Sequence, residues 1–410
     1  MQAADLSASI EAILPRVSEA YEYLHRNPEL GKKEFKAHDF LKSKLTAIGY
    51  TEFVASTKAP TAVIAVLDSG RPGPVIALRA EMDARPIGTN VSEPSTHDPR
   101  SEITGVMHNC GHDVHTAILL GAAELLRQNR RNIAGKVVFL FQPAEETAGG
   151  ADDIVGEGIL PRLGVEKIFA QHVAPGMPVG TIAISAGASL AGSSYFTVKL
   201  KGRESHAASP QDGDDMPLFA AGVARDLADF PARRLDIANR PVVISVAKLH
   251  SASEALNMIP GDAEISGTIR AFEDPQAPAT SGKSIEAMLV ELLDGLTAAR
   301  GIKYEWSLRL GSPPTVNNAA LFDEAVRGLT GSWPGTLKTT PSRGMFSEDF
   351  AFYTRYHHAL YFSLGIAQDG LGEVGVHKTD FTVHRDALRN GLTLMTLLAM
   401  IGTTGSAAWQ

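Results

Sequence analysis

Five side chains able to bind a metal lie within the eight residues of the segment HNCGHDVH. They are His108, Cys110, His112, Asp113 and His115. A thiolate, imidazoles and a carboxylate this close together suit a divalent transition metal. An isolated cysteine is more often a small buried apolar residue, but His112 and Asp113 beside Cys110 favour a metal ligand. The glycine between Cys110 and His112 lets both side chains turn towards one ion, whereas His108 and His115 are predicted to be supporting contacts.

Two adjacent carboxylates, Glu145 and Glu146, follow the apolar run KVVFLFQ in the segment FQPAEE. Such pairs are common on solvated loops, but a position directly after a buried strand favours a functional role. Adjacent residues point in different directions, so one carboxylate can bind a metal while the other faces the water that the metal activates. That second carboxylate can accept the proton of the water and pass it to a leaving amine. This chemistry is hydrolytic and needs no nucleophilic serine, and the sequence contains no GxSxG motif.

Three further polar residues end apolar segments or lie in a glycine-rich loop. Asp83 follows the run VIALRA, and His172 closes the run KIFAQH. His172 is either a ligand or a core histidine that has its own hydrogen-bond partners. His377 lies far along the chain in GEVGVHKTDF, where a ligand would have to fold back onto the site.

The elements that must position these residues alternate between strands and helices. Continuous apolar runs predict strands covered on both faces at 61–68, 75–80, 136–142 and 167–172. Apolar residues at helical spacing predict helices over 9–26, 34–48, 115–129 and 386–401. This order predicts an α/β fold with a mixed, largely parallel sheet covered by helices. In such sheets a ligand site lies past the carboxyl ends of the strands, where the polar residues above fall.

The middle of the chain has a different pattern. Strands and helices are predicted at 195–202, 214–230, 241–250, 262–272, 281–299 and 302–310, in the order β-α-β-β-α-β. This order forms a split βαβ unit that can close on itself as a small α+β domain. We therefore predict a catalytic domain at 1–190 and 311–410, with an inserted domain at 191–310.

Composition excludes several classes of protein. Asp and Glu number 46 against 38 Lys and Arg, a net charge of −8, which argues against a nucleic-acid partner. No apolar run reaches the roughly 18 residues of a membrane span, so no membrane partner is expected. The N-terminal segment lacks the pattern of a signal peptide, and the single cysteine cannot form an internal disulfide. A cytoplasmic location is the resulting expectation.

Several motifs in order resemble one known family. They are HRNPELGKKEF, LRAEMDARP, MHNCGHDVHTA, FQPAEE, SHAASP, NMIPGDAEISGTIRAF and SEDFAFY. From about residue 21 to 400 the chain is similar to the metal-dependent amidohydrolases that include auxin-conjugate hydrolases, hippurate hydrolases and N-acyl-amino-acid aminoacylases. These form a branch of the dinuclear-metal, carboxypeptidase-like peptidases.

The resemblance implies two divalent metal ions, typically manganese, zinc, cobalt or nickel. The positions that match the ligands of the family are Cys110, His112, Glu146, His172 and His377. Glu145 matches the general acid/base, and Asp83 and Asp113 are expected to support the site.

The resemblance also implies roles for the inserted domain. In the family this domain is a lid that mediates homodimerisation. Its residues His206, Asn257 and Arg270 match positions that hold a substrate carboxylate or polarise the scissile carbonyl. Arg270 offers a planar fork suited to a carboxylate, and His206 can stabilise an oxyanion.

The sequence departs from the family at some positions and leaves the substrate open. Glu81 stands where aspartate is usual, and Glu204 and Ser205 replace two glycines before His206. The leading hypothesis is hydrolysis of the amide bond of a small, carboxylate-bearing N-acyl compound by activated water. One alternative is hydrolytic removal of an amino group from an aminobenzoate-type ring, with release of ammonia. Another is a binding protein that retains a metal without catalysis.

Overall fold

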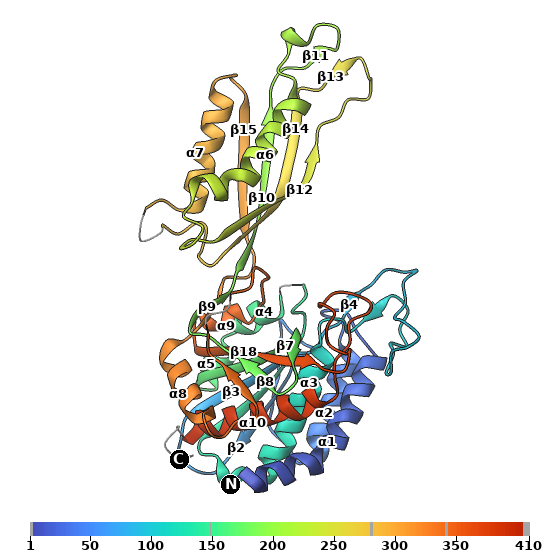
Figure 1. Ribbon diagram of the computed structural model, residues 1–410, viewed down its shortest axis with the longest axis vertical. Helices are drawn as coiled ribbons and strands as arrows, with labels where there is room; N and C mark the ends of the chain where they lie inside the picture. The colour runs from blue at the N-terminus through green and yellow to red at the C-terminus, as the bar shows by residue number, and fades with distance from the viewer. Residues whose placement is uncertain (1–2, 148, 279–281, 341–342, 405–410) are drawn as a thin grey trace. The chain divides into compact units, whose positions relative to one another are not determined.

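The computed structural model describes residues 3–147, 149–278, 282–340 and 343–404. The chain forms two compact units (Figure 1). The first unit comprises Met1–Gly187, Val316–Ser342 and Phe352–Gln410, and the second comprises Ala188–Thr315 and Arg343–Ala351. That the first unit is the catalytic domain and the second the lid stays a prediction. The predicted domain limits at residues 1 and 410 lie outside the described residues.

A mixed sheet of eight strands forms the centre of the first unit. Its order is β1 (Phe53–Val54), β2 (Val63–Asp68), β6 (Lys136–Gln142), β3 (Val75–Glu81), β7 (Val165–Pro178), β18 (His358–Ala367), β8 (Thr181–Ala183) and β17 (Thr336–Lys338). The four central strands β6, β3, β7 and β18 run parallel to one another, whereas the pairs β1–β2, β2–β6 and β18–β8 are antiparallel. Strands β6, β3 and β18 are buried almost throughout, which accounts for their continuous apolar sequence. The predicted α/β class is confirmed, and β1, β8, β17 and β18 are additional to the four strands predicted.

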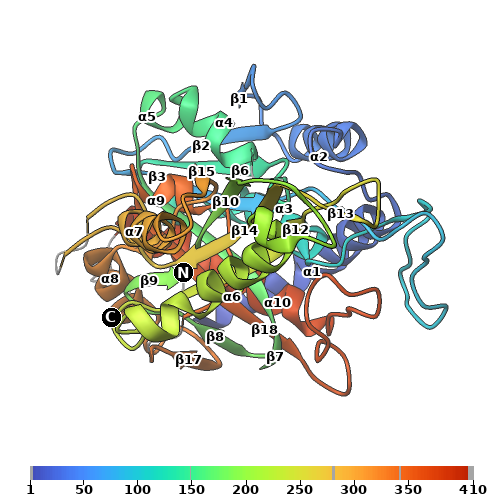
Figure 2. The same ribbon diagram turned by 90° about the horizontal axis from the view of Figure 1, so that it is seen from above.

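Three long helices pack against one another, and the second and third of them also contact this sheet (Figure 2). They are α1 (Ala3–Arg26), α3 (His112–Gln128) and α10 (Asp386–Thr404). A side chain at Gly121 of α3 would place its Cβ 2.4 Å from Val17 Cγ2, so this glycine allows α1 and α3 to approach closely. Outside the inserted region, the described residues form six further helical segments: α2 (Phe35–Ala47), η1 (Arg130–Asn132), α4 (Gly150–Gly156), α5 (Ile159–Arg162), α8 (Ala319–Leu329) and α9 (Ala351–Thr354).

The second unit contains the predicted β-α-β-β-α-β order, as β10 (Gly192–Lys201), α6 (Met216–Arg234), β12 (Val242–His250), β14 (Asp262–Ala271), α7 (Ile285–Ala298) and β15 (Lys303–Leu310). The strands form an antiparallel sheet in the order β12-β14-β10-β15, and α6 and α7 pack beside each other on it (Figure 1). Helix α7 starts later than predicted because the Ser284 hydroxyl caps it by accepting from Ala287 N at 3.1 Å. The predicted start at residue 281 lies outside the described residues.

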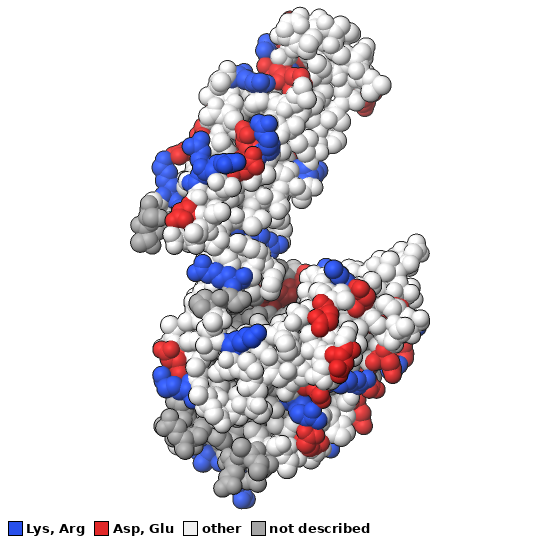
Figure 3. Space-filling model, in the orientation of Figure 1, with Lys and Arg blue, Asp and Glu red and all other residues white. Residues whose placement is uncertain are grey.

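Short elements complete the chain. They are β4 (Arg85–Pro86), β5 (Val106–Met107), β9 (Gly187–Leu190), β11 (Ser205–His206), η2 (Pro210–Asp212), β13 (Met258–Ile259) and β16 (Thr315–Asn317). Among the helices of the described residues, none has the length and apolar character needed to cross a membrane. On the face drawn in Figure 3, basic and acidic side chains are interspersed.

Candidate metal centre

The candidate ligands of the first unit converge past the ends of neighbouring parallel strands. Glu145 and Glu146 follow β6, and His172 lies on β7 beyond Ala170, the last residue that pairs with β3. Strands β6 and β7 flank β3 in the sheet, so both contribute to the same edge. Cys110 and His112 lie at the start of α3. The expected position of the site at the strand ends therefore agrees with where the structure places these residues.

Gly111 explains how both Cys110 and His112 can turn into the site. Its φ of 86° lies in the left-handed region, which glycine adopts without steric cost. A Cβ at this position would also lie 2.6 Å from Val173 Cγ2, so a larger residue would push α3 away from β7. Glycine is needed for both the turn and the close packing.

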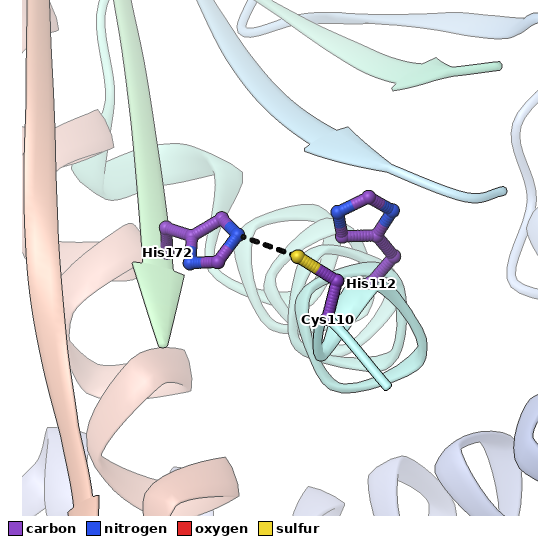
Figure 4. Close-up of side chains that lie close together, drawn as sticks. All are labelled: Cys110, His112 and His172. Carbon is purple, nitrogen blue, oxygen red and sulfur yellow. Dashed lines mark hydrogen bonds between the residues drawn. The ribbon is translucent and has the colours of Figure 1, made fainter. Parts of the chain in front are cut away.

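Four of the five predicted ligands lie around the sulfur atom of the fifth, Cys110. The ligand atoms of Cys110, His112 and His172 lie within 4.8 Å of one another, and the same holds for Cys110, Glu146 and His377. Figure 4 shows His172 of β7 facing Cys110 at the start of α3, with Nε2 3.4 Å from Sγ. Residues far apart in the sequence thus form one cluster of nitrogen, oxygen and sulfur donors.

Hydrogen bonds orient two of the imidazoles so that one nitrogen of each faces the cluster. His112 donates from Nδ1 to the backbone oxygen of Asp83 at 2.8 Å, and its buried Nε2 makes no hydrogen bond. His172 donates from Nδ1 to the backbone oxygen of Val173 at 2.8 Å, which leaves Nε2 towards Cys110. In metal sites, a histidine typically binds the metal through one ring nitrogen and donates a hydrogen bond from the other, for example to a backbone oxygen. The residues present fit a bound metal.

The charges of the cluster also suit a cation. Burial lowers the pKa of His172 to about 3, so its ring is neutral and keeps a lone pair. Burial alone would raise the pKa of Glu146, but His377, His112 and Arg85 outweigh it and lower the pKa to about 2. Burial raises the pKa of the Cys110 thiol, so a metal must displace its proton on binding.

Asp83 holds the turn that carries the two glutamates. Its Oδ1 accepts from Glu145 N and its Oδ2 from Glu146 N, each at 3.0 Å. Its backbone oxygen accepts from His112, as described above. The expected supporting role of Asp83 therefore has a definite geometry, in which one residue contacts both glutamates and one histidine.

A buried network extends behind His172. Glu81 accepts from Arg79 and from His115 Nδ1, the latter at 2.9 Å. His115 Nε2 accepts from Val173 N at 2.9 Å, so the proton of its ring must be on Nδ1. His115 and Glu81 thus hold the peptide bond that follows His172, and the ring centroids of the two histidines are 4.7 Å apart.

Asp113, also predicted to support the site, belongs to a second buried group. His25 contacts Asp113 with Nδ1 at 2.6 Å and Glu93 with Nε2 at 2.8 Å. Glu93 also accepts from Ser101 N at 2.8 Å. His25 therefore ties the loop around Glu93 to the first turn of α3.

We expect this group to make stability fall at alkaline pH. Burial alone would lower the pKa of His25, but its bonds to Asp113 and Glu93 outweigh burial and raise the pKa from 6.5 to about 9. Because the folded-state pKa is the higher one, the stabilisation is complete below about pH 6.5 and is lost as the pH rises through about 9. This change corresponds to on the order of 3 kcal/mol.

The measurement is urea unfolding with a chelator present, from pH 6 to pH 10, for the native chain and for His25→Asn. The native chain should lose more unfolding free energy over this range than the variant does. Parallel pH curves for the two proteins would contradict the assignment.

Arg85 and His377 complete the outer side of the cluster. Arg85 Nη1 forms an ion pair with Glu146 and lies 3.3 Å from His377 Nε2. His377 Nε2 lies 3.2 Å from Glu146 Oε1, and its backbone N donates to Asn109 O at 2.7 Å. The glycine-rich loop therefore does fold back, as a ligand at position 377 requires.

The other predicted site residues lie in the second unit. His206 on β11 accepts from Ala208 N through Nδ1 at 3.1 Å, and Ala207 N donates to Asn257 O at 2.8 Å. His206 and Asn257 thus share the small β11–β13 ribbon. Arg270 on β14 donates to Ser347 Oγ at 2.7 Å. These contacts are internal to the second unit.

Glu34, Arg85 and His25 were not among the predicted site residues. Glu34 and His25 both lie in the segment HRNPELGKKEF, which carries part of the family resemblance, so a signal for them was present. Their burial and their partners 110 and 88 residues away follow from the fold and not from local pattern.

Comparison with known proteins agrees with this fold. The sequence profile of Peptidase family M20/M25/M40 matches residues 77–401. Thermostable carboxypeptidase 2 of Saccharolobus solfataricus is 33% identical over 92% of this chain and 93% of its own. N-acyl-L-amino acid amidohydrolase of Geobacillus stearothermophilus is 35% identical, over 80% of this chain and 86% of its own.

A solved structure of another protein has a similar fold. The Bacillus subtilis YXEP protein, a dinuclear metal binding peptidase from the M20 family, has a TM-score of 0.81 and 27% identity, over 95% of this chain and 98% of its own. The α/β fold, the family profile and these relatives together define a hydrolase of the amidohydrolase and peptidase class. The chain belongs to Peptidase family M20/M25/M40.

Proposed function

We propose that this chain hydrolyses the amide bond of a small N-acyl compound that bears a carboxylate, and releases an amine or amino acid. The observation that carries the proposal is the convergence of five metal-binding side chains beside a sixth, Glu145, whose carboxylate oxygen lies 3.9 Å from His112 Nε2. Relatives named as an N-acyl-L-amino acid amidohydrolase and as an IAA-amino acid hydrolase of Arabidopsis thaliana, the latter 34% identical, support this substrate class.

Two divalent ions would be held by the five donor residues Cys110, His112, Glu146, His172 and His377. One sulfur, three imidazoles and one carboxylate favour zinc, cobalt or nickel over magnesium or calcium. The family resemblance adds manganese to these. When bound, such ions lower the pKa of water and polarise a carbonyl oxygen.

The residues of the chain supply the proton transfer and the binding of the substrate. Glu145 takes the proton of the attacking water and delivers it to the leaving nitrogen. His206 holds its neutral-form proton on Nε2, because Nδ1 is an acceptor, and can donate to the developing oxyanion. Arg270 binds the substrate carboxylate through its planar guanidinium, and Asn257 contributes an amide from the ribbon that carries His206.

The second unit would act as the lid and as the site of homodimerisation. β12 is an edge strand of its sheet, and its Val243 and Leu249 side chains are 40% and 44% exposed. An exposed edge strand offers unpaired backbone groups to a second copy. Sedimentation of the full chain should therefore give twice the 43.6 kDa of one chain, and a monomer at micromolar concentration would contradict this expectation.

A substrate panel tests the proposed reaction. The enzyme loaded with manganese or zinc is given N-acyl-amino acids, dipeptides and aminobenzoates, and both amine and ammonia are measured. Release of amino acid from N-acyl-amino acids is the expected result. Ammonia from aminobenzoates alone would instead establish the deaminase alternative, and no turnover despite bound metal would favour a binding protein.

A further inference from the structure

The turn that carries Glu145 is held by two buried carboxylates and not by one. Three consecutive backbone N–H groups, at residues 144, 145 and 146, each donate to a carboxylate oxygen. Asp83 accepts the second and third. The first, from Ala144, goes to Glu34 Oε1 at 2.9 Å. Glu34 thus completes a clamp on the residues that lead into the site.

Ala144 has a backbone conformation that needs such support. Its φ is 58°, in the left-handed region that residues other than glycine rarely adopt. Strained residues of this kind persist when the surrounding structure enforces them, and they cluster at functional sites. Here the next residue along the chain is Glu145. A change of φ at Ala144 would redirect the carboxyl group that follows.

Glu34 is built into this position from several sides. It is completely buried, and its Oε1 also accepts from Lys32 N at 3.0 Å, while Oε2 accepts from the Thr61 hydroxyl at 2.8 Å. A Cβ at Gly31 would lie 3.2 Å from the Cα of Ala144, so the segment 31–34 packs directly on the turn. Burial and the nearby Asp83 raise the pKa of Glu34 to about 7, as expected for a carboxyl group kept away from water.

We propose that Glu34 is a positioning residue, which holds Ala144 in its left-handed conformation and so sets the direction of the Glu145 carboxyl group. The proposal rests on the proposed function in one respect, namely that Glu145 performs the proton transfer. The hydrogen-bond partners of Glu34 are Lys32, Thr61 and Ala144, none of which is a candidate ligand. Its effect should therefore appear in kcat, with metal content and KM unchanged.

Two substitutions at Glu34 distinguish the effect of losing the hydrogen-bond acceptor from the effect of changing the volume of the side chain. Glu34→Met keeps a similar size but leaves the Ala144 N–H without its acceptor. Because small displacements of a catalytic group can cost about 100-fold in rate, we expect a fall in kcat of between about 10- and 100-fold. Glu34→Gln keeps an oxygen for Lys32 N and Ala144 N, and its amide can donate to Thr61, so kcat should stay close to the native value.

Thr61→Val is the matched control for stability. It removes another buried hydrogen bond to the same carboxylate but does not touch Ala144. It should lower the melting temperature and leave kcat unchanged. If it lowers kcat as much as Glu34→Met does, the effect is one of general stability and the proposal fails.

A double substitution tests the conformational step directly. Glycine adopts a positive φ without support, so Ala144→Gly should restore much of the kcat that Glu34→Met removes. Failure of this rescue, or loss of metal together with kcat, would overturn the proposal. A crystal structure of Glu34→Met gives a readout that needs no activity: Ala144 should leave the left-handed region. An unchanged turn there would refute the positioning role even if the proposed reaction itself proved wrong.

Discussion

Glu145→Gln should lower kcat by about three orders of magnitude, because general acid–base catalysis contributes roughly 10²- to 10⁴-fold. The substitution keeps the shape of the side chain but removes its ability to accept a proton. Glu145 is held at the site through its backbone N–H and Asp83, a contact that glutamine does not alter. Bound metal, measured by elemental analysis, should therefore remain at the native level.

The neighbouring residue provides the matched control. Glu146→Gln is the same chemical change one position along the chain, but Glu146 is a candidate ligand whose carboxylate is paired with His377 and Arg85. This variant should lose metal, and its activity should recover in part at high metal concentration. If Glu145→Gln also loses metal, or turns over at the native rate, the assignment of proton transfer to Glu145 and of metal binding to Glu146 is wrong.

Asp83→Asn is expected to have the second largest effect. An aspartate accepts from Glu145 N and Glu146 N with one oxygen each, whereas an asparagine can accept only one of them. The other N–H would face the NH₂ group, so the turn must open. Both glutamates would move, and we expect kcat to fall by about 100-fold. Metal affinity should fall by about 10- to 100-fold, as for other residues that support ligands.

Metal titration and steady-state kinetics on the same preparations check both effects. Asp153→Asn is the control, because Asp153 forms an ion pair with Lys32 on the surface of the first unit and does not contact the turn. Its kcat and its metal affinity should equal those of the native chain. A loss of activity in Asp83→Asn with native metal affinity would mean that Asp83 positions Glu145 but contributes nothing to the position of Glu146.

Apolar pattern alone was sufficient to predict most of the scaffold. Buried parallel strands such as β6 and β3 consist mostly of consecutive apolar residues. In helix α10, apolar residues recur at helical spacing. The order β-α-β-β-α-β in the second unit follows from the same local signals. Strand β18 was missed although HALYFSLGIA is just as apolar, because α9 and residues 355–357 before it lack the glycine and proline boundaries that marked the other strands.

The candidate ligands could also be predicted from residue type and spacing. Cys110 and His112 are close in the chain, and Glu145 and Glu146 are adjacent, so short motifs contain them. His172 and His377 were less certain from local pattern, because a histidine at a strand end or in a loop has several ordinary roles. The family resemblance, and not the spacing, assigned them to the same site.

What local pattern could not predict is how the site is held. Glu34 accepts a hydrogen bond from Ala144, 110 residues away, and His25 contacts Asp113, 88 residues away. The left-handed conformation of residue 144 could not be predicted from its type, because alanine rarely adopts a positive φ. Residue types and their periodicity report local preferences for helix, strand and metal binding. Hydrogen bonds between segments far apart arise only when the sheet and its helices have packed, since that packing excludes water and makes each buried donor require a specific acceptor.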